Sequence, residues 1–156
     1  MFDLDQFLPY LINRAGVRLA VSFARDIADT GVALQEWRVL AVLAAAGEQR
    51  LSDLAGLTSI DLSTLSRLVT RMARQGLVAR LNGNRDRRER RIALTEKGRG
   101  RTRAIIPTAR RYERLALAGL SAAEEQTLKR LLRRVFANLE GLDRSPARFA
   151  LRRDER

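Results

Sequence analysis

The spacing of hydrophobic residues changes between residues 51 and 98, and this change limits the possible folds to a few. Apolar residues at three- and four-residue steps predict two short helices, one ending at Leu57 and one ending at Gln75, joined by a tight turn. After Gly76 the pattern becomes that of two short strands, 77–81 and 90–94, with a strongly charged segment between them. This order predicts a helix-turn-helix followed by a β-hairpin whose tip is charged.

Residue types that are common at helix ends support the predicted bounds of these helices. Ser52 is expected to cap the first short helix, and Ser59 or Asp61 the second, because short side-chain oxygens accept the free backbone N–H groups there. Thr95 is expected to cap the helix that follows the hairpin. The sequence Ser-Ala-Ala-Glu at 121–124 predicts a capping box at the start of a last helix.

Longer helices flank the hairpin and the two short helices. Residues 3–29 and 122–143 each carry an apolar stripe at helical spacing, and residues 34–46 are apolar nearly all round, as in a central core helix. The predicted fold class is therefore mainly α with a small β-hairpin wing, that is, a winged helix-turn-helix with added helices at both ends.

The length of the chain suits a single domain. A chain of 156 residues buries a sufficient core without disulfides or metals. We expect one domain over residues 1–143, with the winged helix-turn-helix core at about 34–98. Residues 144–156 are basic and interrupted by Pro146, and they predict a flexible tail.

The apolar runs and the N-terminal segment bear on location. No apolar run approaches the roughly 18 residues that cross a bilayer, so no membrane partner is expected. The N-terminal segment begins with acidic residues and stays amphipathic, unlike a signal peptide. The expected location is the cytoplasm.

Two missing residue types exclude much chemistry. The chain has no cysteine, which excludes disulfides, thiol redox sensing and thiolate metal sites. It has no histidine, the usual zinc ligand and general base. No paired carboxylates and no nucleophile with its base can be assembled. We therefore expect neither an enzyme nor a metal or other cofactor.

The charge of the chain points to a polyanionic partner. The formal net charge is +12, and of the 30 basic residues only Lys97 and Lys129 are lysine. The planar guanidinium of arginine pairs with phosphates and base edges better than the lysine ammonium does. The alternative is that the arginines reflect coding bias and solvated helix faces.

The region that carries the helix-turn-helix and the hairpin resembles the DNA-binding core of the MarR family of bacterial transcription regulators. In that family an Asp-x-Arg wing is followed by a strand and then by Leu-Thr-x-x-Gly. Here these residues are Asp86, Arg88, Leu94, Thr95 and Gly98. The resemblance covers about residues 36–98, and it implies that the helices at 3–29 and 99–143 are dimerisation helices.

The second short helix has the residues of a recognition helix. Its polar face combines small hydroxyls with arginines, which approach a major groove closely and donate to phosphates or guanine. Leu62, Leu65, Leu68, Val69 and Met72 are expected to form its buried side. The alternative is an ordinary solvated face. The predicted DNA-binding residues of this helix are Ser63, Thr64, Ser66, Arg67, Thr70, Arg71 and Arg74.

The wing is predicted to be a second DNA contact. Like charges crowded into one hairpin repel each other unless a counter-anion is present, and an arginine at the tip can enter a narrow A·T-rich minor groove. The resemblance assigns that role to Arg88, with Asp86 bracing it. The alternative is a self-neutralised, solubilising loop. The predicted wing residues are Arg85, Asp86, Arg87, Arg88 and Arg90.

The apolar stripes of the terminal helices predict a homodimer. A two-fold dimer sets two recognition helices about 10 base pairs apart, so it requires a near-palindromic operator in double-stranded DNA. The alternative is that these helices pack within one chain. The predicted dimerisation residues are Phe7, Leu8, Leu11, Leu128, Leu131, Leu132 and Val135.

The resemblance also implies a small-molecule effector. Members of the family commonly bind aromatic or phenolic acids, or related thioesters, between the dimer helices and the DNA-binding lobe. Arg14, Arg18, Trp37 and Tyr112 have the chemistry to hold an anion beside a ring, although core or interface packing explains each of them equally well. Cysteine-based peroxide sensing and histidine-based metal sensing, known in this family, lack their residues in this chain.

Together these features predict a homodimeric, ligand-responsive transcriptional regulator, most often a repressor in such a family. Two other functions stay open. A nucleoid-type architectural protein would use the same arginines on phosphates alone and would bind any duplex with strong salt dependence. A winged-helix module that docks on an acidic protein surface would show no preference for duplex DNA.

Overall fold

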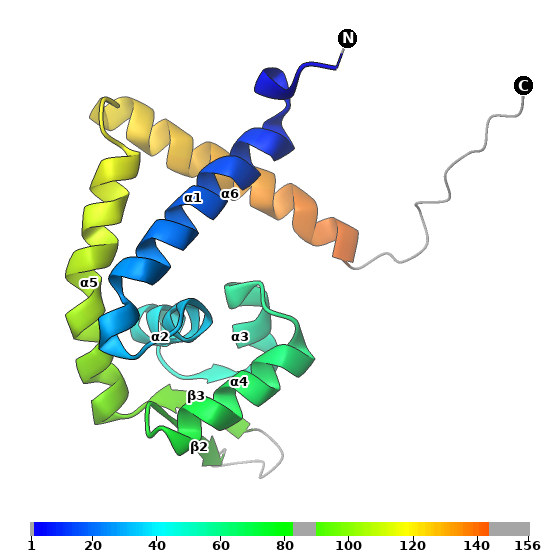
Figure 1. The fold of residues 1–156 in the computed structure, drawn as a ribbon. Coiled ribbons are helices and arrows are strands. Elements are labelled where there is room, and N and C mark those ends of the chain that lie inside the picture. Colours follow the sequence, from blue (N-terminus) through cyan, green and yellow to red (C-terminus); the bar gives the residue numbers. More distant parts are fainter. Residues whose placement is uncertain (1, 83–89, 144–156) are drawn as a thin grey trace, which may run out of the picture. The chain divides into compact units, whose positions relative to one another are not determined.

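The computed structural model describes residues 2–82 and 90–143 and leaves residues 1, 83–89 and 144–156 undescribed (Figure 1). The chain divides into two compact units, residues 1–116 and residues 117–156. Both are dominated by helices, and the first also contains a small antiparallel sheet. The predicted mainly α fold class with a hairpin wing is confirmed.

The helices and strands of the first unit follow the predicted order. The bounds are η1 Leu4–Gln6, α1 Leu8–Asp26, η2 Ala28–Thr30, α2 Leu34–Ala46, β1 Gln49–Arg50, α3 Leu51–Thr58, α4 Leu62–Arg74, β2 Val78–Asn82, β3 Arg90–Leu94 and α5 Glu96–Ala116. The single helix predicted over 3–29 is instead α1 with a short 3₁₀ helix at each side. Pro9 lies in the first turn of α1, where its missing N–H costs no hydrogen bond.

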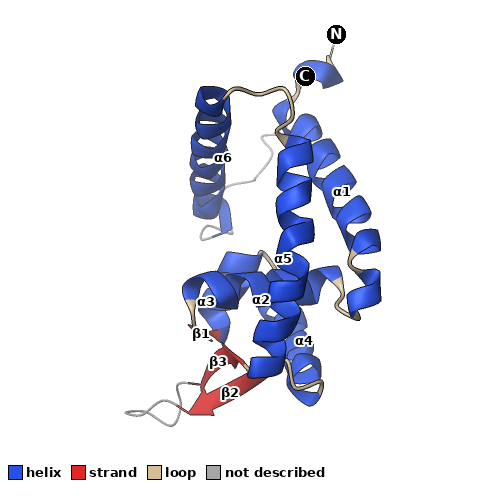
Figure 2. Ribbon diagram, turned by 90° about the vertical axis from the view of Figure 1, so that its left-hand side faces the viewer, coloured by secondary structure: helices blue, strands red, loops and turns tan. Residues whose placement is uncertain are grey.

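The sheet has three strands rather than the two predicted. Its order is β1-β3-β2, and all neighbours are antiparallel. β2 and β3 pair from Val78 with Leu94 to Asn82 with Arg90. β1 has only two residues, which is too short to show an alternating pattern in the sequence. Figure 2 shows the strands close to the first turns of α5.

The core of the first unit lies where α2, α3, α4 and the sheet meet, and α1 and α5 extend from this lobe (Figure 1). Phe23 and Ile105 bring α1 and α5 into the same core. Leu65, Leu68, Val69 and Met72 form the buried side of α4, as predicted. The fully or almost fully buried apolar side chains also include Ile27, Val39, Leu40, Leu43, Leu54, Leu77, Val78 and Ile92.

Two predictions about side chains at helix ends are wrong. Leu62 is 53% exposed, because it is the first residue of α4 and side chains tilt toward a helix N-terminus, past the packed turns. Ser52 lies inside α3, where its hydroxyl donates to Asp53, and the residue before α3 is Arg50. Of the two candidates for the cap of α4, Asp61 is the cap, and Ser59 ends α3 with a left-handed φ of 53°.

The second unit contains α6, Ala122–Asp143. Its predicted capping box is confirmed: the Ser121 N–H donates to the Glu124 carboxylate at 2.8 Å, and the Glu124 N–H donates to the Ser121 hydroxyl at 3.4 Å. No helix within the described ranges is long and apolar enough to cross a membrane.

Candidate nucleic-acid interface

The polar face of α4 is formed as predicted opposite its buried side. Ser63, Arg67 and Arg74 follow one another at steps of four and seven residues and are exposed, and Ser66 and Thr70 beside them are half-buried. The face therefore presents hydroxyls and guanidinium groups to solvent along the length of the helix.

Asp61 organises the N-terminus of α4. Its Oδ1 accepts the backbone N–H of Thr64 at 2.9 Å and the hydroxyl of Ser63 at 2.7 Å. A side-chain hydrogen bond from Thr64 lowers the pKa of Asp61 most, followed by the bond from Ser63 and then by the Thr64 backbone N–H, and together they hold this pKa well below its ordinary value. The Ser63 hydroxyl thus has a capping role in addition to its predicted role on DNA, and it keeps lone pairs free to accept from a base or a bridging water.

Arg71 forms an ion pair with Glu36, a residue of α2. Its Nε donates to Oε1 of Glu36 at 3.2 Å, and the Arg71 side chain is 57% exposed while that of Glu36 is only 3% exposed. The sequence predicted Arg71 as a DNA contact but gave Glu36 no role. The only signal for Glu36 is its position three residues after Ala33, where a carboxylate reaches back to the start of the helix.

Arg80 is a cation beside α4 that the sequence pattern does not mark as a DNA contact. One of its terminal nitrogens donates to the Thr70 hydroxyl at 2.6 Å, and that hydroxyl donates in turn to the Ser66 carbonyl at 2.9 Å. Arg80 lies on β2, so its contact joins the first strand of the hairpin to the polar face of α4. Pairing in the sheet decides which face of β2 meets α4, and the sequence alone does not show this.

The Leu-Thr-x-x-Gly motif fixes the hairpin to α4. The Thr95 hydroxyl accepts the Gly98 N–H at 3.0 Å and lies 2.6 Å from the Gly76 carbonyl, to which it donates. Gly98 is packed so closely that a Cβ would lie 2.0 Å from the Leu77 carbonyl oxygen. Thr95 is thus the predicted cap of α5, and the motif also ties α5 to the end of α4.

The tip of the wing lies outside the described residues. This applies to Arg85, Asp86, Arg87 and Arg88, whose predicted roles stay predictions. Of Arg90, the backbone pairs with Asn82 in the sheet. The next residue, Arg91, forms an ion pair with Glu48 at 3.4 Å, beside the short strand β1.

The predicted effector residues are not gathered into one site. Trp37 and Tyr112 each pack against Phe23, with ring centroids 5.7 Å apart in both pairs. The Tyr112 hydroxyl donates to Asp26 at 2.8 Å, a contact that lowers the pKa of Asp26 more than its neighbouring arginines do. Arg14 lies over the ring of Tyr10, and Arg18 is exposed on α1. Trp37 and Tyr112 therefore have a packing role, and their ligand role stays a prediction.

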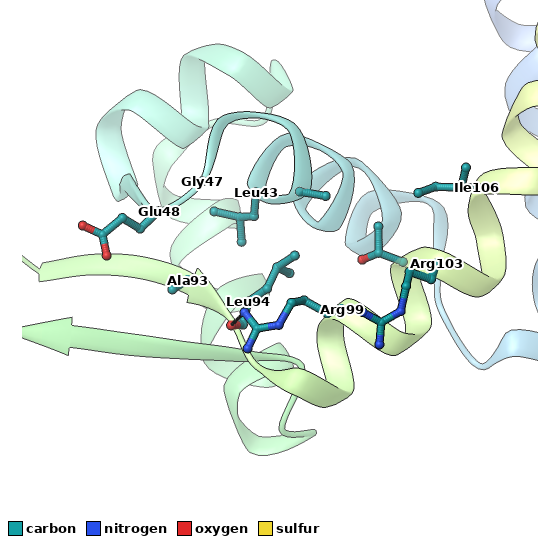
Figure 3. A pocket seen from close by; sticks show the side chains of 10 residues that line it. Leu43, Gly47, Glu48, Ala93, Leu94, Arg99, Arg103 and Ile106 are labelled. Atoms are coloured by element: carbon teal, nitrogen blue, oxygen red, sulfur yellow. Dashed lines mark hydrogen bonds between the residues drawn. The ribbon is translucent and has the colours of Figure 1, made fainter.

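A separate pocket of about 420 Å³ lies between the end of α2, β3 and the start of α5 (Figure 3). Leu43 and Leu94 face one another across it, and Arg99 and Arg103 lie at its edge on α5. Both guanidinium groups pair with Glu96 at 2.9 Å, so their charge is already partly neutralised. None of the predicted effector residues lines this pocket.

The predicted dimerisation residues carry exposed apolar surface in each unit. On α1 and just before it, Phe7, Leu8 and Leu11 are between 42% and 51% exposed. On α6, Leu128, Leu131 and Leu132 are also exposed, and Val135 is half-buried. Within residues 2–82 and 90–143, no group of three or more carboxylates could hold a metal ion.

Comparison with known proteins gives consistent matches. The model of the MarR family matches residues 32–89. The transcriptional repressor IacR of Pseudomonas putida is 30% identical over 141 residues, which cover 90% of this chain and 84% of IacR. The homoprotocatechuate degradative operon repressor of Escherichia coli is 32% identical over 120 residues, covering 76% of this chain and 80% of that repressor.

A solved structure extends the similarity to the described fold. The structure of Bordetella bronchiseptica BpsR, a protein whose DNA binding is regulated by 6-hydroxynicotinic acid, matches with a TM-score of 0.76 at 27% identity. The match covers 86% of this chain and 96% of BpsR.

Proposed function

Because the chain belongs to the MarR family of transcriptional regulators, we propose that it is a homodimeric repressor, released from a near-palindromic operator by a small aromatic or phenolic acid or a related thioester. It binds double-stranded DNA in the cytoplasm and has no catalytic activity. The single observation that supports this most strongly is the polar face of α4, where Ser63, Arg67 and Arg74 are exposed beside one another.

The groups on this face are those that major-groove recognition requires. Small hydroxyls permit close approach to base edges, and arginines donate to phosphates or to guanine. Asp61 and the Thr95–Gly98 motif fix both ends of the helix, so the face is preorganised. The wing residues Arg85, Asp86, Arg87, Arg88 and Arg90 complete the proposed contact in the adjacent minor groove.

The class of effector is supported by the relatives. The regulator BpsR responds to a hydroxylated aromatic acid, and the E. coli relative is named for homoprotocatechuate, a phenolic acid. A single-ring acid of this kind is the first class to test. Arg14, Arg18, Trp37 and Tyr112 stay the proposed contacts, with Trp37 and Tyr112 supplying aromatic surface near the junction of α1, α2 and α5.

The experiment is a binding titration against the upstream intergenic DNA of the gene and against a scrambled duplex of equal length, at about 150 mM salt. We expect a preference of about 10³-fold or more, the low end for specific binding, and loss of the complex when the aromatic acid is added. Equal binding to both duplexes that collapses with salt would instead support the architectural function, for which the net charge of +12 is the favouring observation.

A further inference from the structure

Arg71 differs from the other arginines of α4 because a carboxylate of another helix holds its side chain. Its Nε is bound to Glu36, whereas Arg67 and Arg74 form no hydrogen bond or ion pair with any residue that the structure describes. The outer part of the Arg71 side chain remains in solvent, since 57% of it is exposed. The Nε atom of Arg71 is therefore held by the protein, while its terminal nitrogens are available to bind DNA.

Glu36 is itself fixed at both carboxylate oxygens. Oε1 accepts from Arg71, and Oε2 accepts the backbone N–H of Ala33 at 2.9 Å, at the start of α2. With 3% exposure, the carboxylate has almost no freedom to follow a mobile partner. The position of the Arg71 guanidinium is consequently set by the core through α2, and not by α4 alone.

The geometry of the guanidinium group allows Arg71 to bind a phosphate while its Nε is bound to Glu36. An arginine whose Nε is occupied still has two terminal nitrogens, with a spacing that suits the oxygens of a phosphate. Holding the side chain in advance reduces the conformational entropy that is lost on binding. The ion pair is exposed on the Arg71 side and adds little net stability, and the capping of α2 by Glu36 does not by itself require that Arg71 be bound.

We propose that Glu36 is a positioning residue that presents Arg71 to a backbone phosphate of bound DNA. This inference deepens the proposed function, because it rests on α4 facing a duplex. Arg71 lies at the α2 side of the α4 polar face, next to the central row of Ser63, Arg67 and Arg74. Phosphates border a major groove, so a residue at the edge of a recognition face is placed to meet one.

The test is a double-mutant cycle of DNA affinity, with salt dependence as a second readout. Glu36→Gln keeps the side-chain shape and an acceptor for the Ala33 N–H but turns an amide toward Arg71. We expect it to weaken operator binding by about two- to tenfold, from the ordering cost of one long side chain. Its plot of log affinity against log salt should keep the wild-type slope, because Arg71 remains charged.

Arg71→Gln should reduce the magnitude of that slope by about 0.9, the value for one lost phosphate contact. In the Arg71→Gln background, Glu36→Gln should then change affinity no further. Arg74→Gln is the matched control: it removes an unbraced arginine of the same helix, and in its background Glu36→Gln should have its full effect. Circular dichroism and urea unfolding confirm that each variant is folded.

Two results would contradict the proposal that Glu36 positions Arg71 for a phosphate. One is an unchanged salt slope for Arg71→Gln, which would remove Arg71 from the phosphate contacts. The other is an equal effect of Glu36→Gln with and without Arg71, which would mean that Glu36 acts only by capping α2. If Arg71→Gln alone unfolds, the double variant Glu36→Gln/Arg71→Gln leaves no buried charge and supplies the slope.

The measurements distinguish a wrong positioning role for Glu36 from a wrong proposed function. Salt slopes are measured on both the operator and the scrambled duplex. Equal wild-type affinity for the two would contradict a sequence-specific regulator, while the slopes would still decide whether Arg71 meets a phosphate. Absence of any binding to duplex DNA would contradict both proposals.

Discussion

At the scale of single residues, Gly98 shows how a short motif specifies this fold. The backbone of α5 passes so close to Leu77 that no side chain fits, and Thr95 holds it there by accepting the Gly98 N–H. Gly100, two residues further along the same helix, has no neighbouring atom within 4 Å of the place where a Cβ would lie. Glycine is therefore required at position 98, whereas position 100 has room for a side chain.

Gly98→Ala should lower the free energy of unfolding by about 3 kcal/mol, the upper end for a methyl group forced into a packed site. The neighbouring atom is a backbone carbonyl, which cannot rotate away. Urea unfolding measures the change. Gly100→Ala is the control, and it should raise the unfolding free energy by up to about 1 kcal/mol, because alanine favours a helix over glycine. Equal effects of the two substitutions would contradict the close approach at Gly98.

The Asp61 cap makes a prediction about pH. Because its pKa is lowered in the folded chain, Asp61 stabilises the fold above the pKa of about 3.9 that it has when unfolded, and this contribution is lost as the pH falls further. Asp61→Asn still caps α4 but does not titrate. The stability of the wild type relative to this variant should therefore decrease between about pH 5 and pH 3. Parallel pH profiles would mean that the Asp61 carboxylate makes no such contribution.

Single residues also mark where the sequence was insufficient. The Leu-Thr-x-x-Gly motif was recognisable, and so was the exposed row of Ser63, Arg67 and Arg74. The Glu36–Arg71 pair was not, because it joins residues of two helices that only the packing of α2 against α4 brings together. Leu62 was placed on the buried side because helical spacing ignores the end of the helix, where no neighbouring turn covers the side chain.

At the scale of elements, local signals decided which predictions were right. Residues 34–46 and 90–94 have the predicted bounds, since glycine, threonine and a change of spacing mark their ends. β1 was missed because two residues carry no periodicity, and it exists through pairing with β3. α4 was predicted with its buried and polar sides, and its function depends on that division.

The polar face of α4 predicts which arginines bind DNA. Arg67→Gln should weaken binding to any duplex and reduce the magnitude of the salt slope by about 0.9, because one phosphate contact is lost. If Arg67 instead contacts a base, the loss should be about 1–3 kcal/mol and confined to the operator. Arg130→Gln, on the exposed side of α6 opposite its apolar stripe, is the control of equal charge. An unchanged affinity and slope for Arg67→Gln would remove Arg67 from the interface.

At the scale of the whole molecule, the exposed apolar stripes are the main feature that one chain leaves unexplained. α1 and α6 both carry leucines that are about half exposed, and α6 buries none of its described side chains fully. Stripes of this kind at helical spacing are typical of association surfaces. The assignment of these helices to a dimer interface stays a proposal that rests on this exposure and on the family.

The dimer proposal predicts the effect of a charge on the stripe. Leu131→Asp should shift the protein from dimer to monomer, because an unpaired carboxylate cannot be buried in an apolar interface without large cost. Light scattering measures the mass in solution. Arg130→Asp is the matched control on the opposite side of α6, and it should leave the dimer intact. A dimer of normal mass for Leu131→Asp would contradict the assignment of the stripe.

In the proposed dimer, two copies of α4 bind one operator, and hydroxyl-radical footprinting of that DNA shows whether they do. We expect two protected segments related by inverted symmetry, with centres about 10 base pairs apart, one for each recognition helix of the dimer. Addition of the aromatic acid should remove both segments together. Protection of a single segment, or weak and uniform protection along the duplex, would contradict a dimeric, sequence-specific regulator.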